Sequence, residues 1–571
     1  MEGWEAFAKA SWEDILPFYE ELASRELDLG TVEQWLADWS SFEERLSEAG
    51  TRAEFAYSRN TADAQAEAAQ KRFGEQIEPK AGEQRVRLQK RLVEMDYEGA
   101  GMEVVMKEFR SAVELFRAAN VPLEAEISSL VTEWNKVNGD LGVDWEGQEV
   151  TPEALVPFLL STDRGVREKA FRLRAQAYLE KRETLSAIFD QMHALRSQTA
   201  RNAGFANYRD YAHTAMCRFD YTPDDCARFC EAVEAIATPA AARVLERRRQ
   251  KMGLERLRPW DLAVDAQGRG ALQPFDSEAS LVGLGERMVG RVDQAFTAYY
   301  RTMVEQGTLD LFNRKGKAPG GYSDILEQSK LPVIFMNAVG VDEDVRTLLH
   351  ESGHAFHWLE AARQPLVFQR NPGSEIAEVA SMAMELLASP YLAREAGGCY
   401  SEAEANRSRI ALLEDIILFL PHCASVDAWQ QWAYTNEAGA DLVAREAKWL
   451  ELRMRFEGDS VDWSGMEEQR VARWYQQPHF FSDPFYYIEY GIAQMGALQV
   501  WRNRLRNPAK AVADYRAALA LGSSVSLPEL YARAGAKLVF DKAGMQDLVE
   551  MVEGELAALE VGKEEPAVGL I

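Results

Sequence analysis

Two histidines and a glutamate stand at the spacing of a metal-dependent hydrolase. The run from His350 to His357 reads H-E-S-G-H-A-F-H and holds three of the chain's seven histidines. On a helix, His350 and His354 lie one turn apart on the same face, where both imidazoles can bind one metal ion. Glu351 then lies beside the open coordination position, where it can act as a base toward a water molecule. The pattern therefore predicts the zinc site of a hydrolase.

The flanking residues predict the helix that this motif needs. Asp342, Glu343 and Asp344 precede the motif, and carboxylates near a helix N-terminus stabilise the helix dipole. Leu348 and Leu349 supply an apolar stripe at helical spacing. We therefore expect a single helix to begin at this acidic segment and to carry both histidines.

A catalytic zinc ion typically has three protein ligands, so the motif needs one more. His357 lies three residues after His354 on the same face. It is about 10 Å from His350 along the helix axis, however, which is too far to complete a tetrahedral set. A carboxylate from a second helix is the better solution.

The stretch 375–388 is the best candidate for that second helix, with Ser374 as its N-cap. Glu378, Ser381 and Glu385 share one face of this otherwise apolar segment. Buried carboxylates are costly unless they bind a metal or a donor, so we expect Glu378 to be the third ligand and Ser381 and Glu385 to support the ligands. The alternative is an exposed amphipathic helix with ordinary surface acids.

The segment 479–490 holds a histidine and three tyrosines: His479, Tyr486, Tyr487 and Tyr490. Asp483 and Pro484 predict an N-cap and first turn, so the tyrosines are expected on one helix. Peptide hydrolysis develops an oxyanion on the scissile carbonyl, and phenol or imidazole donors can stabilise it. The alternative is an aromatic core patch.

Composition bounds the class of protein. The 571 residues are 47% hydrophobic and carry a net charge of −27, which argues against a nucleic acid or an anionic membrane as partner. No run of eighteen apolar residues predicts a membrane span, and the first residues lack the pattern of a signal peptide. The five cysteines show no close CxxC pairing. We expect a cytoplasmic protein and make no prediction of its oligomeric state.

Nearly every long segment has helical spacing, so the predicted fold class is mainly α. Helices are expected at these ranges: residues 12–29, 32–49, 53–73 and 83–96, and a second block over 151–202 with a break at 162–165. Residues 331–337 form the best strand candidate, directly before the metal-binding helix. We divide the chain into an N-terminal helical lobe, 1–185, and a zinc-bearing catalytic domain, 186–571.

The H-E-x-G-H-x-x-H run and the stretch E-V-A-S that begins 28 residues later at Glu378 resemble the thimet oligopeptidase and oligoendopeptidase F family of zinc metallopeptidases, most of all its bacterial oligoendopeptidase F branch. Further motifs of that family are similar in the same order: residues 204–208 (GFANY), 258–261 (RPWD) and 316–322 (GKAPGGY), and Asn337. The resemblance extends over most of the chain and is strongest after about residue 150.

The resemblance implies a helical ellipsoid of two lobes around a deep substrate channel, with one Zn²⁺ per chain and a small β element near the zinc helix. It implies His350, His354 and Glu378 as metal ligands and five catalytic residues: Glu351, His479, Tyr486, Tyr487 and Tyr490. The spacing between the histidine and the tyrosines is one residue shorter than in the thimet branch, so either Tyr486 or Tyr487 can be the first tyrosine. Supporting or substrate-binding residues are expected to be His357, Ser381, Glu385, Asn337, Gly320 and Gly321.

These observations predict a zinc endopeptidase that hydrolyses internal bonds of short, unstructured oligopeptides. The strand that ends at Asn337 is expected to pair with the substrate main chain as an edge strand. One alternative is a zinc carboxypeptidase on a similar helical fold, which needs a cationic group for the terminal carboxylate. The other is a helical peptide-binding protein whose site is inactive.

Overall fold

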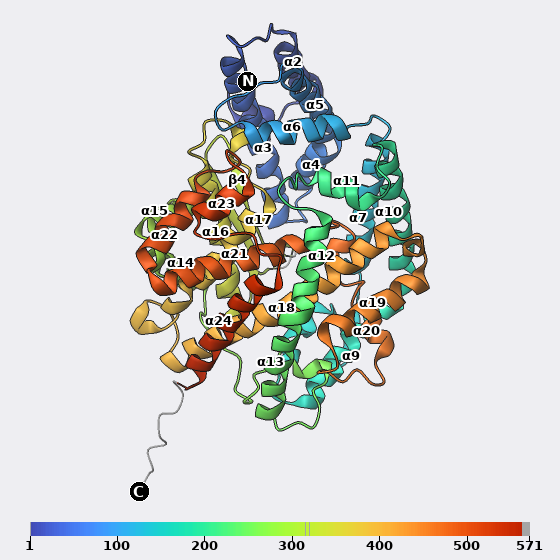
Figure 1. Cartoon of the computed structure of the whole chain (residues 1–571), viewed down its shortest axis with the longest axis vertical. Coiled ribbons are helices and arrows are strands. Elements are labelled where there is room, and N and C mark those ends of the chain that lie inside the picture. Colours follow the sequence, from blue (N-terminus) through green and yellow to red (C-terminus); the bar gives the residue numbers. More distant parts are fainter. Residues whose placement is uncertain (1, 315, 319, 562–571) are drawn as a thin grey trace. The chain divides into compact units, whose positions relative to one another are not determined.

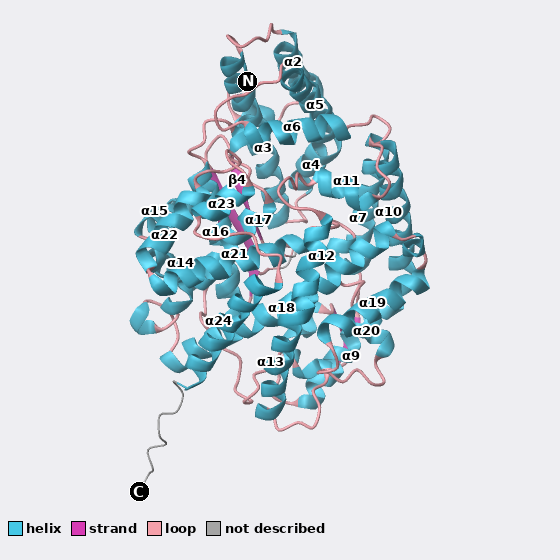
Figure 2. Ribbon diagram, viewed as in Figure 1, coloured by secondary structure: helices cyan, strands magenta, loops and turns pink. Residues whose placement is uncertain are grey.

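The computed structural model describes residues 2–314, 316–318 and 320–561, most of which lie in helices (Figure 2). The predicted mainly α class is therefore confirmed. Pro319, which belongs to the motif at 316–322, lies outside the described residues. The small β element predicted near the zinc helix is also present, as the three strands that precede that helix.

The chain divides into two compact units, each built from three segments. Unit 1 comprises Met1–Phe116, Leu272–Ser408 and Ile492–Leu538, and unit 2 comprises Arg117–Ala271, Arg409–Gly491 and Val539–Ile571. Two of the five boundaries fall inside helices, one in α18 (Glu402–Thr435) and one in α21 (Tyr487–Arg506) (Figure 1). The division at residue 185 and the substrate channel stay predictions.

The helices and strands of unit 1 are α1 (Trp4–Phe7), α2 (Trp12–Ser24), α3 (Val32–Arg59), α4 (Ala64–Lys71), α5 (Glu78–Glu94), α6 (Glu103–Leu115), α14 (Glu278–Val292), α15 (Gln294–Glu305), β3 (Leu309–Phe312), β4 (Tyr322–Leu326), β5 (Leu331–Ala338), α16 (Asp342–Ala361), α17 (Ser374–Ala388), α22 (Pro508–Leu519) and α23 (Leu527–Arg533).

Those of unit 2 are α7 (Val121–Gly139), β1 (Val143–Trp145), β2 (Gln148–Val150), α8 (Val156–Leu159), α9 (Arg164–Glu180), α10 (Arg182–Asn202), α11 (Tyr208–Ala215), α12 (Pro223–Ala232), α13 (Thr238–Lys251), α19 (Leu442–Glu457), α20 (Glu467–Ala472) and α24 (Lys542–Val561).

The first helices begin near the predicted positions, but one predicted break is wrong. Helix α3 continues through Gly50, where the sequence suggested a boundary, and ends at Arg59. A glycine inside a helix costs about 1 kcal/mol. The buried stripe of α3, which includes Trp35, Trp39 and Phe42, stabilises the helix by more than this cost. Tertiary packing therefore outweighs the local signal.

The sheet of unit 1 has the strand order β3-β5-β4, with β5 parallel to β3 and antiparallel to β4. The predicted strand at 331–337 is confirmed, but its expected role as an edge strand is wrong, because β5 lies between two other strands. Its sequence explains this position: the apolar run from Val333 to Met336 is fully buried, which is typical of a central strand.

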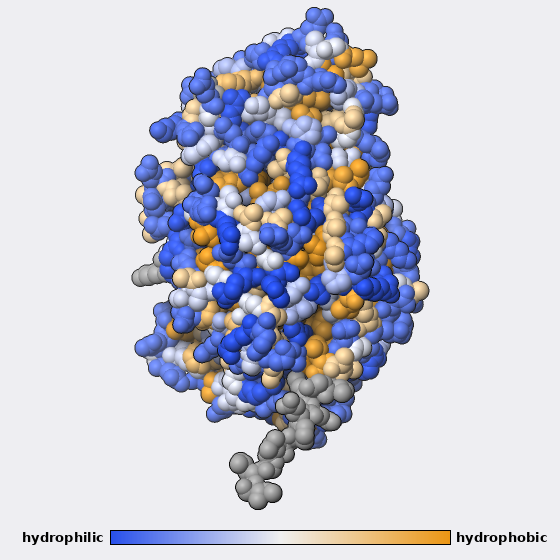
Figure 3. Space-filling view, turned by 90° about the vertical axis from the view of Figure 1, so that its left-hand side faces the viewer, coloured by the Kyte–Doolittle hydropathy of each residue, from blue (hydrophilic) through white to orange (hydrophobic). Residues whose placement is uncertain are grey.

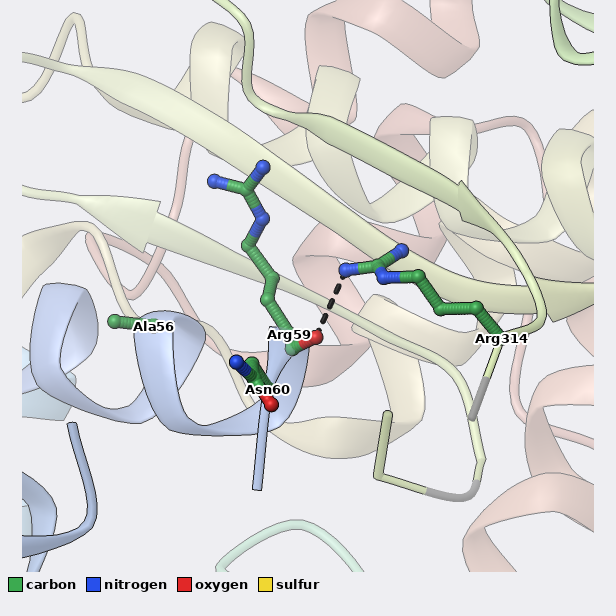
Figure 4. A pocket seen from close by; sticks show the side chains of 4 residues that line it. All are labelled: Ala56, Arg59, Asn60 and Arg314. Carbon is green, nitrogen blue, oxygen red and sulfur yellow. Dashed lines mark hydrogen bonds between the residues drawn. The ribbon is translucent and has the colours of Figure 1, made fainter. Parts of the chain in front are cut away.

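A cluster of cations around Asp310 ties the loop before β4 to strand β3. The buried Asp310 carboxylate forms ion pairs with Arg59 at 2.7 Å, with Arg314 at 2.6 Å and with Lys317 at 2.6 Å. Lys317 also donates to the carbonyl oxygens of Asp310 and Phe312. Arg314 donates to the Arg59 carbonyl at 2.8 Å. Both residues line an open pocket, and none of its four lining residues is a predicted metal ligand (Figure 4).

Asp310→Asn is expected to lower the free energy of unfolding by about 3 kcal/mol at pH 7, because it leaves the buried Lys317 ammonium group without its counter-charge. Burial alone would raise the pKa of Asp310, but the hydrogen bonds from Arg314, Lys317 and Arg59 hold it well below its ordinary value. A carboxyl group whose pKa is lower in the folded than in the unfolded protein stabilises the fold at pH values above its unfolded pKa of about 4. This stabilisation is lost as the pH falls below that value.

Urea unfolding of both proteins between pH 7 and pH 3 measures this difference. The exposed Asp547 of α24 provides the matched control, and Asp547→Asn is expected to change the free energy of unfolding by less than about 0.5 kcal/mol. A wild-type advantage over Asp310→Asn that does not shrink below about pH 4 would contradict the ionic account.

Within the described ranges, no helix is long and apolar enough to cross a membrane. Hydrophilic residues cover most of the face shown in Figure 3, and apolar residues lie between them in small groups. A core of buried aromatic and aliphatic side chains fills the N-terminal helices of unit 1 from Phe7 to Phe109.

Candidate active site

Helix α16 begins where the acidic segment predicts it. Asp344 lies in its first turn, and one of its carboxylate oxygens, Oδ2, accepts hydrogen bonds from the backbone N–H groups of Val339, Gly340 and Val341 at 2.9, 2.7 and 2.9 Å. Strand β5 ends at Ala338, so this cap fixes the direction of the helix directly after the strand. The two predicted histidine ligands thus lie on an element that is anchored at its first turn.

Helix α17 carries the predicted third ligand on a buried face. It begins at Ser374 itself, so the predicted N-cap is one residue late and Gly373 takes that position. Glu378 and Ser381 are 5% and 0% exposed, and Glu385 is half-buried. The alternative of an exposed helix with surface acids is therefore wrong.

Helices α16 and α17 are in close contact at Gly353. A Cβ atom on this residue would lie 2.5 Å from the carbonyl oxygen of Ala380 and 2.6 Å from the Cα of Ser381. The same carbonyl accepts a hydrogen bond from the buried Tyr515 hydroxyl at 2.7 Å. Gly353 therefore permits the short distance that brings a ligand from α17 to the histidines of α16.

His350, His354 and Glu378 offer three ligand atoms that all lie within 4.8 Å of one another. Glu378 Oε2 is 3.4 Å from His350 Nε2 and 3.6 Å from His354 Nε2. Ligands at 2.0–2.2 Å around a tetrahedral zinc ion are separated by about 3.4 Å, so the donor set and its spacing fit this metal. The structure thus brings together the three residues that the sequence singled out as ligands.

Further side chains hold these ligands in place. His350 Nδ1 lies 2.8 Å from Glu385 Oε1, and this contact orients the ring so that Nε2 faces Glu378. The Ser381 hydroxyl donates to Glu378 Oε2 at 2.9 Å. Burial alone would raise the pKa of Glu378, but the hydrogen bond with His350 and the charge of His354 lower it to about 2. The third ligand is therefore a carboxylate at neutral pH.

Glu351 lies beside the ligands with an unused acceptor. Its side chain is 6% exposed, and among the described residues its Oε2 atom has no hydrogen-bond partner. Burial raises the pKa of Glu351 to about 7. A Cβ atom on Gly321 would lie 3.7 Å from the other oxygen, Oε1, so the backbone of the motif loop closes over this carboxylate.

Two other predicted supporting residues, His357 and Asn337, are a buried ring and a side chain that holds a loop. His357 is buried, and its burial lowers its pKa to about 3. Asn337 Nδ2 donates to the carbonyl oxygens of Ala318 and Gly320, both at 2.8 Å, so this side chain holds the loop that leads to Gly321. Their roles toward a substrate stay predictions.

In unit 2, the predicted histidine and tyrosines form one aromatic cluster. The ring centroid of His479 lies 4.9 Å from that of Tyr487, 5.8 Å from that of Tyr490 and 5.9 Å from that of Tyr486. Tyr490 lies 5.1 Å from Tyr486 and 5.5 Å from Tyr487. All three tyrosines are half-buried, so the cluster is not a closed core patch.

The predicted start of the tyrosine helix is wrong. Helix α21 begins at Tyr487, not at Pro484, because Phe485 adopts the left-handed conformation with φ +72°. The buried Gln430 accepts from the Phe485 backbone N–H at 2.5 Å, and Arg218 donates to the Phe485 carbonyl at 2.6 Å. These contacts stabilise the turn, which places Tyr486 ahead of the helix.

Some residues that shape the site carry no signal in the sequence. Tyr515 reaches α17 from α22, far along the chain, and no motif surrounds it. Gly353 could have been suspected, since a small residue between two ligands permits a close helix contact. His422, which no motif surrounds, contacts both Arg453 and Gln477.

Comparison with known proteins places these motifs in a family. The model of peptidase family M3 matches residues 158–550, and that of the peptidase M3 N-terminal domain matches residues 6–115. The chain belongs to peptidase family M3.

Relatives and solved structures agree with this assignment. The oligoendopeptidase F homolog of Borreliella burgdorferi is 22% identical over 64% of this chain, and oligopeptidase PepF of Bacillus subtilis is 22% identical over 69%. The matches span 61% and 57% of the lengths of these relatives. A structure of PZ peptidase A with an inhibitor superposes with a TM-score of 0.89 at 25% identity, over 97% of this chain and 99% of that one.

Proposed function

We propose that this protein is a zinc-dependent endopeptidase that hydrolyses internal bonds of short, unstructured oligopeptides. The observation that carries the proposal is the convergence of His350, His354 and Glu378, with Glu378 Oε2 3.4 and 3.6 Å from the two histidine nitrogens and the carboxylate of Glu351 beside them. The names of the curated relatives, oligoendopeptidase F and oligopeptidase, support the same substrate class.

A bound zinc ion would act as a Lewis acid that makes a water molecule more acidic and polarises the scissile carbonyl. Glu351 accepts the proton of the attacking water as the new C–O bond forms. It then gives this proton to the amine nitrogen as the C–N bond breaks, so no proton is left over. Burial and the unused Oε2 acceptor suit Glu351 to both steps.

His479, Tyr490 and either Tyr486 or Tyr487 are proposed to donate hydrogen bonds to the oxyanion or to the substrate backbone. The clustering of these four rings in unit 2 supports a shared role. His357, Gly320 and Gly321 are proposed to contact the ligands or the substrate.

The proposed location is the cytoplasm. Within the described residues, no disulfide bond joins the five cysteines, Cys217, Cys226, Cys230, Cys399 and Cys423, which is typical of proteins from reducing compartments. Oligopeptides are the proposed partners, and the acidic net charge of −27 is unfavourable for nucleic acid.

Cleavage of a fluorogenic peptide of about ten residues, blocked at both ends, tests the proposal. We expect cleavage at an internal bond, identified by mass spectrometry, which stops when a chelator removes the metal and returns when Zn²⁺ is added. A second peptide of the same sequence with a free C-terminus is the matched control.

Each other outcome points to an alternative. Cleavage of only the peptide with a free C-terminus, one residue at a time, would assign a carboxypeptidase instead. Tight binding of both peptides without turnover, in protein that contains stoichiometric zinc, would assign a peptide-binding protein.

A further inference from the structure

His479 is connected to a buried arginine by a line of side-chain hydrogen bonds within unit 2. Arg453 Nη1 lies 2.5 Å from His422 Nδ1. His422 Nε2 lies 3.3 Å from Gln477 Oε1, and Gln477 Nε2 lies 2.9 Å from His479 Nδ1. The four side chains come from α19, from α18, from the residue before the short 3-10 helix Pro478–Phe480, and from that helix itself.

The arginine determines the direction of every bond in this line. A guanidinium group can only donate, so Nδ1 of His422 must be the acceptor. The single proton of a neutral His422 ring then lies on Nε2, which donates to the oxygen of Gln477. The amide nitrogen of Gln477 consequently faces His479 and donates to its Nδ1 atom.

The surroundings support the two protonation states on which this direction depends. Burial and the positive charges of Arg473 and Arg470 lower the pKa of Arg453. The ordinary pKa of arginine is so high that the side chain nevertheless stays a cation, and Glu457 forms an ion pair with it. Burial, together with the positive charges of Arg453 and Arg473, holds the pKa of His422 well below its ordinary value. His422 is therefore neutral at pH 7 and carries only one ring proton.

We propose that Arg453, His422 and Gln477 act as positioning residues that fix His479 as the tautomer with its proton on Nε2. His479 accepts through Nδ1, so Nε2 is its donating nitrogen. An oxyanion needs a donor, and the inference thus deepens the role given to His479 above and rests on that proposed function.

The tautomer can be measured without any assay of activity. In the full chain labelled with ¹⁵N-histidine, long-range ¹H–¹⁵N spectra distinguish protonated from unprotonated ring nitrogens. The signals of His479 and His422 are assigned from the spectra of His479→Gln and His422→Gln. We expect protonated Nε2 and unprotonated Nδ1 in both rings of the wild type. A proton on Nδ1 of either neutral ring would overturn the inference.

Gln477→Met removes the amide but keeps the length of the side chain. We expect the His479 signals to become those of a mixture of tautomers, and kcat to fall about tenfold with KM changed by less than about twofold. Gln499→Met is the matched control, because the buried Gln499 donates to backbone carbonyls of unit 1 outside this line.

The NMR spectra and the kinetics together distinguish the positioning role of Gln477 from the role of His479 in the reaction. Unchanged His479 signals in Gln477→Met, or an equal loss of kcat in Gln499→Met, would overturn the positioning role of Gln477. A changed tautomer with unchanged kcat would instead overturn the role proposed for His479 in the reaction.

Discussion

Glu351→Gln is expected to lower kcat/KM for an internal peptide bond by about 10³-fold while the protein keeps its metal. Glutamine has the same size, so it fits the space between α16 and the backbone near Gly321. It cannot accept the proton of the attacking water, however, and the proton for the leaving amine is lost with it. The three proposed ligands are untouched, so zinc content should stay at one ion per chain.

The control for this substitution lies on the same helix. Glu343 is exposed in the first turn of α16, and Glu343→Gln is expected to change kcat/KM by less than about twofold. Kinetics with the doubly blocked peptide and elemental analysis of zinc are measured for both variants. If Glu351→Gln keeps more than about a tenth of the wild-type kcat/KM, Glu351 is not the base.

Gly353→Ala is expected to give the second largest effect, through structure rather than chemistry. The new methyl group would lie 2.5 Å from the Ala380 carbonyl oxygen and 2.6 Å from the Ser381 Cα, and both are backbone atoms. Helix α17 must therefore move away from α16 and carry Glu378 with it. We expect a loss of about 3 kcal/mol in the free energy of unfolding and a clear loss of zinc affinity.

Gly82→Ala is the matched control, because Gly82 also lies in a helix of unit 1, and a Cβ atom there would meet nothing within 4 Å. This change is expected to stabilise the fold by up to about 1 kcal/mol. Thermal unfolding and a zinc competition assay measure the effects. Zinc affinity that is unchanged in Gly353→Ala would contradict the view that this glycine sets the distance between the ligands.

The metal group could be predicted because its signals are local. His350 and His354 lie on one helix, and the face shared by Glu378, Ser381 and Glu385 can be recognised from helical spacing alone. Carboxylates on an otherwise apolar helix are costly to bury unless they bind a metal or a donor, so this face indicated the third ligand. The structure adds the pairing of His350 with Glu385, which no spacing rule within one helix can give.

The remaining features depend on contacts between distant segments. Strand β5 was expected at an edge. Its apolar run is typical of a central strand, but its own sequence does not reveal that β3 and β4 are its partners. The turn at Phe485 needs Gln430 and Arg218, each far away in the chain. A proline after an aspartate favours a helix start, and these distant contacts outweigh that local preference.

The line of hydrogen bonds from Arg453 to His479 also depends on distant segments, so it could not be predicted from the sequence. Three separate segments supply its members, and His422 has no motif around it. The direction of the hydrogen bonds follows from the guanidinium group at one end, which can only donate. Its contact with His422 is visible in the structure and not in the spacing of the sequence.

An X-ray anomalous difference map at the zinc absorption edge tests the central claim most directly. We predict one peak per chain, bonded to His350 Nε2, His354 Nε2 and a carboxylate oxygen of Glu378 at about 2.0–2.2 Å. Absence of a peak in active protein, or a peak with other ligands, would contradict the account.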